Sequence, residues 1–223
     1  MNSKPLVAGL GLGLLLGLLG RDAGAQTLAV SQQPAPAARL TAPFADVAEL
    51  NEGQTEEVVR WGFAQLGERN LDEAAHAFER VLLADRMNRS ARFGLSTVFV
   101  EKGYARQAVG LWEKMLVDFP EDHAVLNNYA WLLATTLEPE IRDPARALDL
   151  ARNAMILAPE DHHVWSTLAE AYFAAGEFEA ARRAALKAYE LYRARFPQGD
   201  RLNVYVQQVE RCTQAVRAFD ILD

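Results

Sequence analysis

Residues 159–188 read PEDHHVWSTLAEAYFAAGEFEAARRAALKA, and the spacing of side chains in this stretch decides the fold class. Trp165, Leu168 and Tyr172 follow one another at steps of three and four residues, and two alanines after them are seven residues apart. Both spacings place side chains on one face of an α-helix. Gly176 separates the two patterned segments and interrupts the helix. The stretch therefore predicts two short helices that fold back on each other.

This motif resembles the tetratricopeptide repeat (TPR). The pattern W-x2-L-A-x2-Y, followed by a glycine and then an alanine, runs from Trp165 to Ala181. A helix hairpin of this kind cannot bury both of its faces alone and needs neighbouring repeats. The resemblance implies an all-α, right-handed superhelical solenoid with a general role in holding other proteins.

The same register recurs along the chain. Ala74 and Ala108 are 34 residues apart, which is the TPR period. The step from Ala108 to Ala147 is 39 residues, and the extra residues fall between two helices, at Thr135 to Arg142. That longer loop is either a tolerated surface insertion or a contact point for a partner. The register predicts a TPR domain over residues 51–223, with repeats at about 55–88, 89–122, 123–161 and 162–195 and a capping helix at about 200–220.

Several local signals refine this prediction. The first repeat is atypical, because Arg69 stands where the second and fourth repeats have a turn glycine. Asn70 with Glu73 three residues later predicts a capping box at the start of a helix. Asp143 and Pro144 predict an N-cap and a first-turn proline.

The final helix is expected to bury one apolar face and to expose the opposite one. The apolar face includes the lone cysteine, Cys212, which we expect in the core. The opposite face, which includes Gln208 and Arg211, is expected in solvent.

The N-terminal 25 residues have the layout of a secretory signal peptide. Lys4 precedes an uninterrupted apolar run from Leu6 to Gly20, and small residues end at Ala25. We expect cleavage after Ala25 and a periplasmic or secreted protein. The alternative is a retained inner-membrane anchor facing the periplasm, which would be the chain's only membrane contact. Residues 26–50 are rich in Ala, Pro and Gln and predict a linker.

Charge and motif content exclude several classes of function. Loss of residues 1–25 leaves 21 basic and 29 acidic residues, a net charge of −8, which argues against nucleic acid as the main partner. No nucleophile motif or phosphate-binding loop is present, so we predict no enzyme, no catalytic residue and no cofactor. His123, His162 and His163 lie at predicted helix starts beside aspartates. They lack the spacing of a metal site, and we expect exposed polar residues instead.

In TPR folds the first helices of successive repeats line a concave groove, and the matching register carries this expectation to the present chain. The predicted partner-binding residues are mostly apolar: Val59, Phe63, Leu66, Phe93, Thr97, Val100, Asn127, Trp131, Ser166, Glu170 and Phe173. Such a surface suits a peptide or helix of a partner protein, with Asn127 bonding to its backbone. Alternatively, the chain's own Phe44 and Leu50 fill the groove.

The sequence therefore predicts a non-enzymatic scaffold or adaptor in the bacterial cell envelope. Two alternatives remain open. One is a self-assembling structural protein, and the other is an accessory subunit of an envelope polysaccharide-synthesis or secretion complex.

Overall fold

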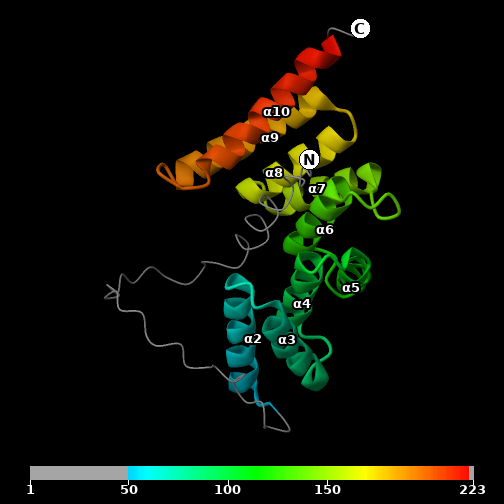
Figure 1. Cartoon of the computed structure of the whole chain (residues 1–223), viewed down its shortest axis with the longest axis vertical. Coiled ribbons are helices and arrows are strands. Elements are labelled where there is room, and N and C mark those ends of the chain that lie inside the picture. The colour runs from blue at the N-terminus through cyan, green and yellow to red at the C-terminus, as the bar shows by residue number, and fades with distance from the viewer. Residues whose placement is uncertain (1–49, 221–223) are drawn as a thin grey trace, which may run out of the picture. The chain divides into compact units, whose positions relative to one another are not determined.

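The structure is a computed structural model that describes residues 50–220, and within that range all regular structure is α-helical (Figure 1). The helices are α2 (Glu52–Gly67), α3 (Leu71–Ala84), α4 (Arg89–Glu101), α5 (Ala105–Asp118), α6 (His123–Thr135), α7 (Pro144–Leu157), α8 (His162–Ala174), α9 (Phe178–Arg195) and α10 (Leu202–Asp220). The predicted all-α fold of antiparallel helix pairs is confirmed. The predicted signal peptide, most of the predicted linker and Phe44 lie outside the described residues.

None of the described helices is long and apolar enough to cross a membrane. The chain divides into two compact units, and the boundary falls within α5, after Ala108. The units are described separately below.

In the first unit, the packing of α2, α3 and α4 centres on the fully buried ring of Phe78 on α3. Gly62 on α2 faces this ring, and a Cβ there would lie 2.9 Å from it. Gly94 on α4 approaches the same ring so closely that a Cβ would overlap it. The ring of Phe63 adds an edge-on contact, with the two ring centroids 4.9 Å apart. The glycines therefore make the space into which one aromatic side chain inserts.

The turn between α2 and α3 is closed by a non-glycine residue in the left-handed region. Arg69 has φ 64°, whereas the equivalent turn glycines, Gly103 and Gly176, have φ 78° and 80°. Arg69 also pairs with Glu101, at 3.4 Å between Nη1 and Oε2. The unusual residue noted in the sequence thus adopts the backbone conformation that glycine adopts elsewhere in the chain.

The predicted capping box at Asn70 is wrong. The Asn70 side chain accepts no bond from the start of α3; its Nδ2 instead donates to Gln65 Oε1 at 2.9 Å, tying the turn back onto α2. A capping box does form at the start of α2, where Asn51 accepts from the backbone of Gln54 and the Gln54 side chain accepts from the backbone of Asn51.

In the second unit, α6 pairs with α7, α8 pairs with α9, and α10 lies beside α9 (Figure 1). Small side chains line the helix pairs, and the fully buried alanines include Ala147, Ala151, Ala154, Ala181, Ala185 and Ala188. They allow close approach of the helices. Asp143 caps α7 by accepting from the backbone of Arg146 at 3.0 Å, with Pro144 in the first turn, as predicted.

Candidate partner-binding surface

The structure divides the eleven predicted groove residues into two groups. Five are buried: Leu66, Phe93, Thr97, Asn127 and Ser166. Six are half-buried: Val59, Phe63, Val100, Trp131, Glu170 and Phe173. A buried side chain cannot meet a partner without a change in structure, so the candidate surface consists of the half-buried group. That these residues bind a partner stays a prediction.

In the first unit, the groove candidates also serve the core. Phe63 packs against the buried Phe78 ring, so part of its apolar area stabilises the fold. Thr97 is 1% exposed, and its hydroxyl donates to the Phe93 carbonyl of its own helix at 2.9 Å. Val59 and Val100 are the remaining half-buried candidates of this unit. Of these residues, Phe63 offers the largest apolar area, although its loss would also disturb the core.

On α6, the amide and the aromatic of the predicted groove lie in different environments. Asn127 is 1% exposed, and its Nδ2 donates to the neighbouring Asn128 Oδ1 at 3.2 Å. The predicted bond from Asn127 to a ligand backbone would need a change in structure and stays a prediction. Trp131, one helical turn further, is half-buried and presents part of its indole at the surface. Trp131 is therefore the clearest partner-binding candidate in the second unit.

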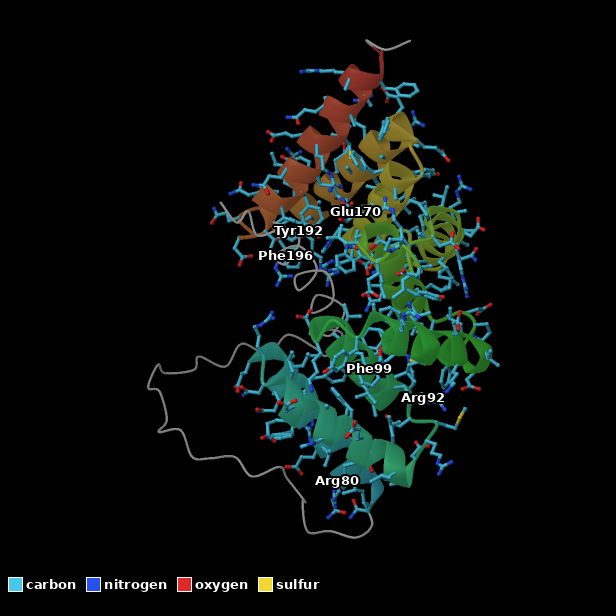
Figure 2. All side chains as sticks on the ribbon, turned by 45° about the vertical axis from the view of Figure 1, so that its right-hand side comes forward. Arg80, Arg92, Phe99, Glu170, Tyr192 and Phe196 are labelled. Atoms are coloured by element: carbon cyan, nitrogen blue, oxygen red, sulfur yellow. The ribbon has the colours of Figure 1, made fainter. Side chains whose placement is uncertain are left out.

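The candidate residues of α8 face a helix of the same chain. Ser166 Oγ donates to Gln208 Oε1 of α10 at 2.9 Å, and Gln208 Nε2 donates to the Ser166 carbonyl at 2.9 Å and to Glu170 Oε1 at 2.7 Å. Arg211 pairs with Glu170, which is labelled on α8 in Figure 2, at 2.5 Å. The Arg211 guanidinium also lies 4.6 Å from the ring centroid of Phe173. We call these three residues, Ser166, Glu170 and Phe173, the α10-covered face of α8.

The expectation that Gln208 points to solvent is wrong, because it is 7% exposed and its amide bonds to α8. A helical wheel separates polar from apolar side chains, and it cannot distinguish a solvated glutamine from one that is buried with its hydrogen bonds satisfied. In the sequence, Gln208 and Arg211 lie one turn apart on one helix face, and this spacing is a signal of a shared polar partner.

The histidines at the start of α8 also differ from expectation. His162 and His163 are 7% and 6% exposed, not solvent-exposed. Asp161, which caps α8, brings a carboxylate within 4.8 Å of both rings, a spacing that metal ions can use. However, the positive charges of Arg195 and Arg201 act on both histidines. A cation is disfavoured there, and no metal ligand is assigned.

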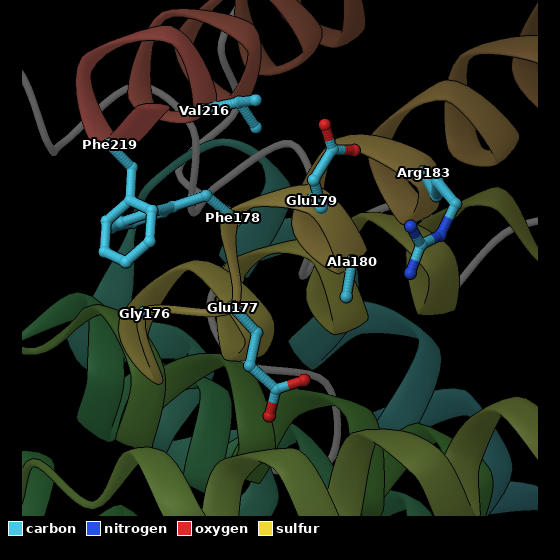
Figure 3. Close-up of a pocket in the computed structure, with 8 residues that line it drawn as sticks. All are labelled: Gly176, Glu177, Phe178, Glu179, Ala180, Arg183, Val216 and Phe219. Atoms are coloured by element: carbon cyan, nitrogen blue, oxygen red, sulfur yellow. The ribbon is translucent and has the colours of Figure 1, made fainter. Parts of the chain in front are cut away.

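A cavity of about 420 Å³ opens between the start of α9 and the end of α10 (Figure 3). The rings of Phe178 and Phe219 lie against each other in it, with centroids 5.9 Å apart. The carboxylates of Glu177 and Glu179 and the guanidinium of Arg183 surround this apolar contact. The lining holds no nucleophile paired with a base, so the cavity offers no catalytic arrangement.

Comparison with known proteins agrees with this architecture. Residues 142–198, which include α7, α8 and α9, match the tetratricopeptide repeat family. This segment matches a tetratricopeptide repeat. The search of curated proteins found no match.

Solved TPR structures share the fold. The thermophilic TPR protein TTC0263 of Thermus thermophilus superposes with a TM-score of 0.54 at 17% identity, covering 72% of this chain and 91% of that one. A MamA protein superposes with a TM-score of 0.52 at 18% identity, covering 74% and 88%. A MamA RS-1 double mutant gives 0.51 at 17% identity, covering 74% and 96%.

TPR domains generally bind protein partners, and TPR proteins are typically non-enzymatic scaffolds. The motif residues of the fourth repeat hold its own helices together. Trp165 Nε1 donates to the Pro159 carbonyl, Leu168 is buried, and Ala181 is fully buried. These motif residues therefore hold the helices of this repeat together.

Proposed function

We propose that this protein is a non-enzymatic adaptor of the bacterial cell envelope that binds a peptide or helix of a partner protein on the first helices of its repeats. The half-buried Trp131 carries this proposal. A large aromatic side chain that keeps part of its surface in solvent is a typical anchor for a partner. The signal-peptide layout of residues 1–25 supports export, and a mature N-terminus at Gln26 would establish it.

Trp131→Ala tests the proposal in the exported chain. Loss of an aromatic anchor is expected to weaken partner capture by about tenfold or more, since such residues contribute about 2 kcal/mol or more to binding. Chemical crosslinking of the wild-type chain identifies the captured protein, and titration of that purified protein measures the loss. Trp131 is preferable to Phe63, because Phe63 also supports Phe78 in the core.

Ile156→Ala is the matched control. Ile156 is an apolar side chain on α7, the second helix of the same pair, and it is 69% exposed. Its removal should leave capture unchanged. Equal losses for the two variants, or a full-affinity Trp131→Ala with an intact helical circular dichroism spectrum, would exclude the face of α6 as the binding site.

Self-assembly is a second candidate function, because an exposed apolar residue recurs with the repeat period. Leu83 and Val117, which are 34 residues apart, are 86% and 82% exposed, and each lies near the end of the second helix of its repeat. A regular array of such residues can serve contacts between copies of one chain. Light scattering of the mature chain decides this: a monomer at all concentrations excludes self-assembly, whereas growth that is abolished by Val117→Glu supports it.

A further inference from the structure

Helix α10 is held on α8 by polar contacts at three successive turns. His162, in the first turn of α8, meets Tyr205, at 2.7 Å between Nδ1 and Oη. Ser166, one turn on, meets Gln208. Glu170, a further turn on, meets Arg211. The contact of α10 with α8 is therefore polar, whereas α10 also packs on α9, and the outermost polar contact involves a histidine, whose ordinary pKa of about 6.5 lies near neutral pH.

His162 sits in a box of aromatic rings that closes only when α10 is docked. Tyr192 and Phe196 of the α9 end, both labelled in Figure 2, and Tyr205 of α10 all meet its ring edge-on, with centroids 5.1, 6.1 and 5.6 Å away. Tyr205 in turn stacks on Tyr192, at 4.7 Å. Burial raises the pKa of Tyr205, so its hydroxyl keeps its proton and is able to donate a hydrogen bond to an unprotonated Nδ1 of a neutral His162.

Burial and nearby charges both act on the protonation of His162. Asp161 of the α8 cap stabilises an imidazolium, but Arg195 of α9 and Arg201 before α10 both oppose one. Burial is the largest cause, and it lowers the pKa of His162. The adjacent His163 lies 4.1 Å away between ring centroids, and burial lowers its pKa to about 3. The docked arrangement thus accepts a proton much less readily than an exposed histidine does.

We propose that His162 and Tyr205 form a pH-sensitive latch, which releases α10 in mildly acidic solution and uncovers the α10-covered face of α8. The sign follows from linkage. A released His162 titrates near its ordinary pKa of about 6.5, whereas the docked one stays neutral to lower pH. Docking is therefore strongest above about pH 6.5 and weakens as the pH falls, by up to about tenfold per pH unit for this one histidine. The latch does not depend on which partner the repeats bind.

Cys212 supplies a direct readout of release. It is the only cysteine of the chain, it lies on α10 and it is 0% exposed. Burial raises its pKa to about 11, which makes the docked thiol unreactive. The rate of its reaction with a dithiodipyridine, divided by the rate for the unfolded chain at the same pH, reports the fraction of time that α10 is open.

We expect this normalised rate to rise by up to about 15-fold between about pH 6.5 and pH 5 in the wild-type full chain. His162→Gln keeps a neutral acceptor for Tyr205, so the rise should become much smaller. The matched control is His123→Gln, a half-buried histidine at the start of α6, which should keep the wild-type rise. Tyr205→Phe removes only the hydroxyl and should raise the rate by about two- to tenfold at neutral pH.

A second cysteine position separates latch opening from general unfolding. Val125 on α6 is 0% exposed, and Val125→Cys with Cys212→Ser moves the probe into that core. Its normalised rate should stay flat over the same pH range. A flat wild-type rate at Cys212, an undiminished rise in His162→Gln, or a parallel rise at position 125 would each overturn the proposal.

Discussion

At the scale of single residues, Gly94 decides whether α3 and α4 can pack. In Gly94→Ala the added methyl would overlap the Phe78 ring, and that ring cannot retreat because Gly62 and Phe63 hold its other sides. Overpacking of this kind costs about 1–3 kcal/mol, and the better helix propensity of alanine recovers up to about 1 kcal/mol. We expect a net loss of about 1–2 kcal/mol in the free energy of unfolding, measured by urea denaturation.

Gly110→Ala is the control for this prediction. Gly110 lies in the helix α5, and no atom of another residue lies within 4 Å of a Cβ built there. Only the propensity gain remains, so this variant should be more stable by up to about 1 kcal/mol. Equal gains in the two variants would mean that the Phe78 ring moves aside.

The residue scale also shows where sequence reasoning succeeds. Cys212 was predicted in the core from its place on an apolar stripe, and it is fully buried. Asp143 was predicted as an N-cap from the residue type and the following proline, and it caps α7. The burial of His162 and Gln208 was not predicted, because it depends on partners about 40 residues away in the sequence, and no local pattern reports those.

At the scale of elements, the turn from α2 to α3 carries a backbone cost that the other turns avoid. Arg69 holds φ 64°, which costs a non-glycine residue about 1–2 kcal/mol. Arg69→Ala removes the pair with Glu101 and keeps this cost, whereas Arg69→Gly removes both. We therefore expect Arg69→Gly to be more stable than Arg69→Ala by about 1 kcal/mol, measured by thermal denaturation. Equal stability of the two variants would show that the turn carries no strain.

The elements themselves follow from the sequence more readily than the contacts between them. Three- and four-residue spacings predict each helix of the pairs, because a buried helix face must repeat with the helical period. The longer step in the third repeat corresponds to the loop between α6, which ends at Thr135, and α7, which begins at Pro144. The polar docking of α10 on α8 could not be predicted this way, because it joins side chains about 40 residues apart whose pairing leaves no periodic trace.

At the scale of the whole molecule, the partner-binding surface is less predictable from the sequence than the fold. The repeat period constrains residues that pack helix on helix, whereas a partner constrains residues beside them. Five of the eleven groove residues taken from the register proved to be buried, since the register gives a direction on the helix and not the depth of the neighbouring helix. Trp131 keeps its candidate role because it combines the right register with partial exposure.

A chain of stacked helix pairs should lose stability from the end at which a covering helix is removed, because each pair depends on its neighbours. Truncation after Arg201 deletes α10 and exposes to water the side of Tyr192 that stacks on Tyr205. It also leaves Ser166 and Glu170 without their α10 partners. Since each large side chain buried in such an interface contributes about 1.5–3 kcal/mol, amide exchange in α8 and α9 should accelerate by at least about 30-fold. Exchange in α2 and α3 should stay unchanged, which native-state hydrogen exchange with mass spectrometry resolves helix by helix.

Unaltered protection of α8 and α9 would show that the fourth repeat is stable without α10. Uniform acceleration across all described helices would show that the chain unfolds as one cooperative unit and not pair by pair.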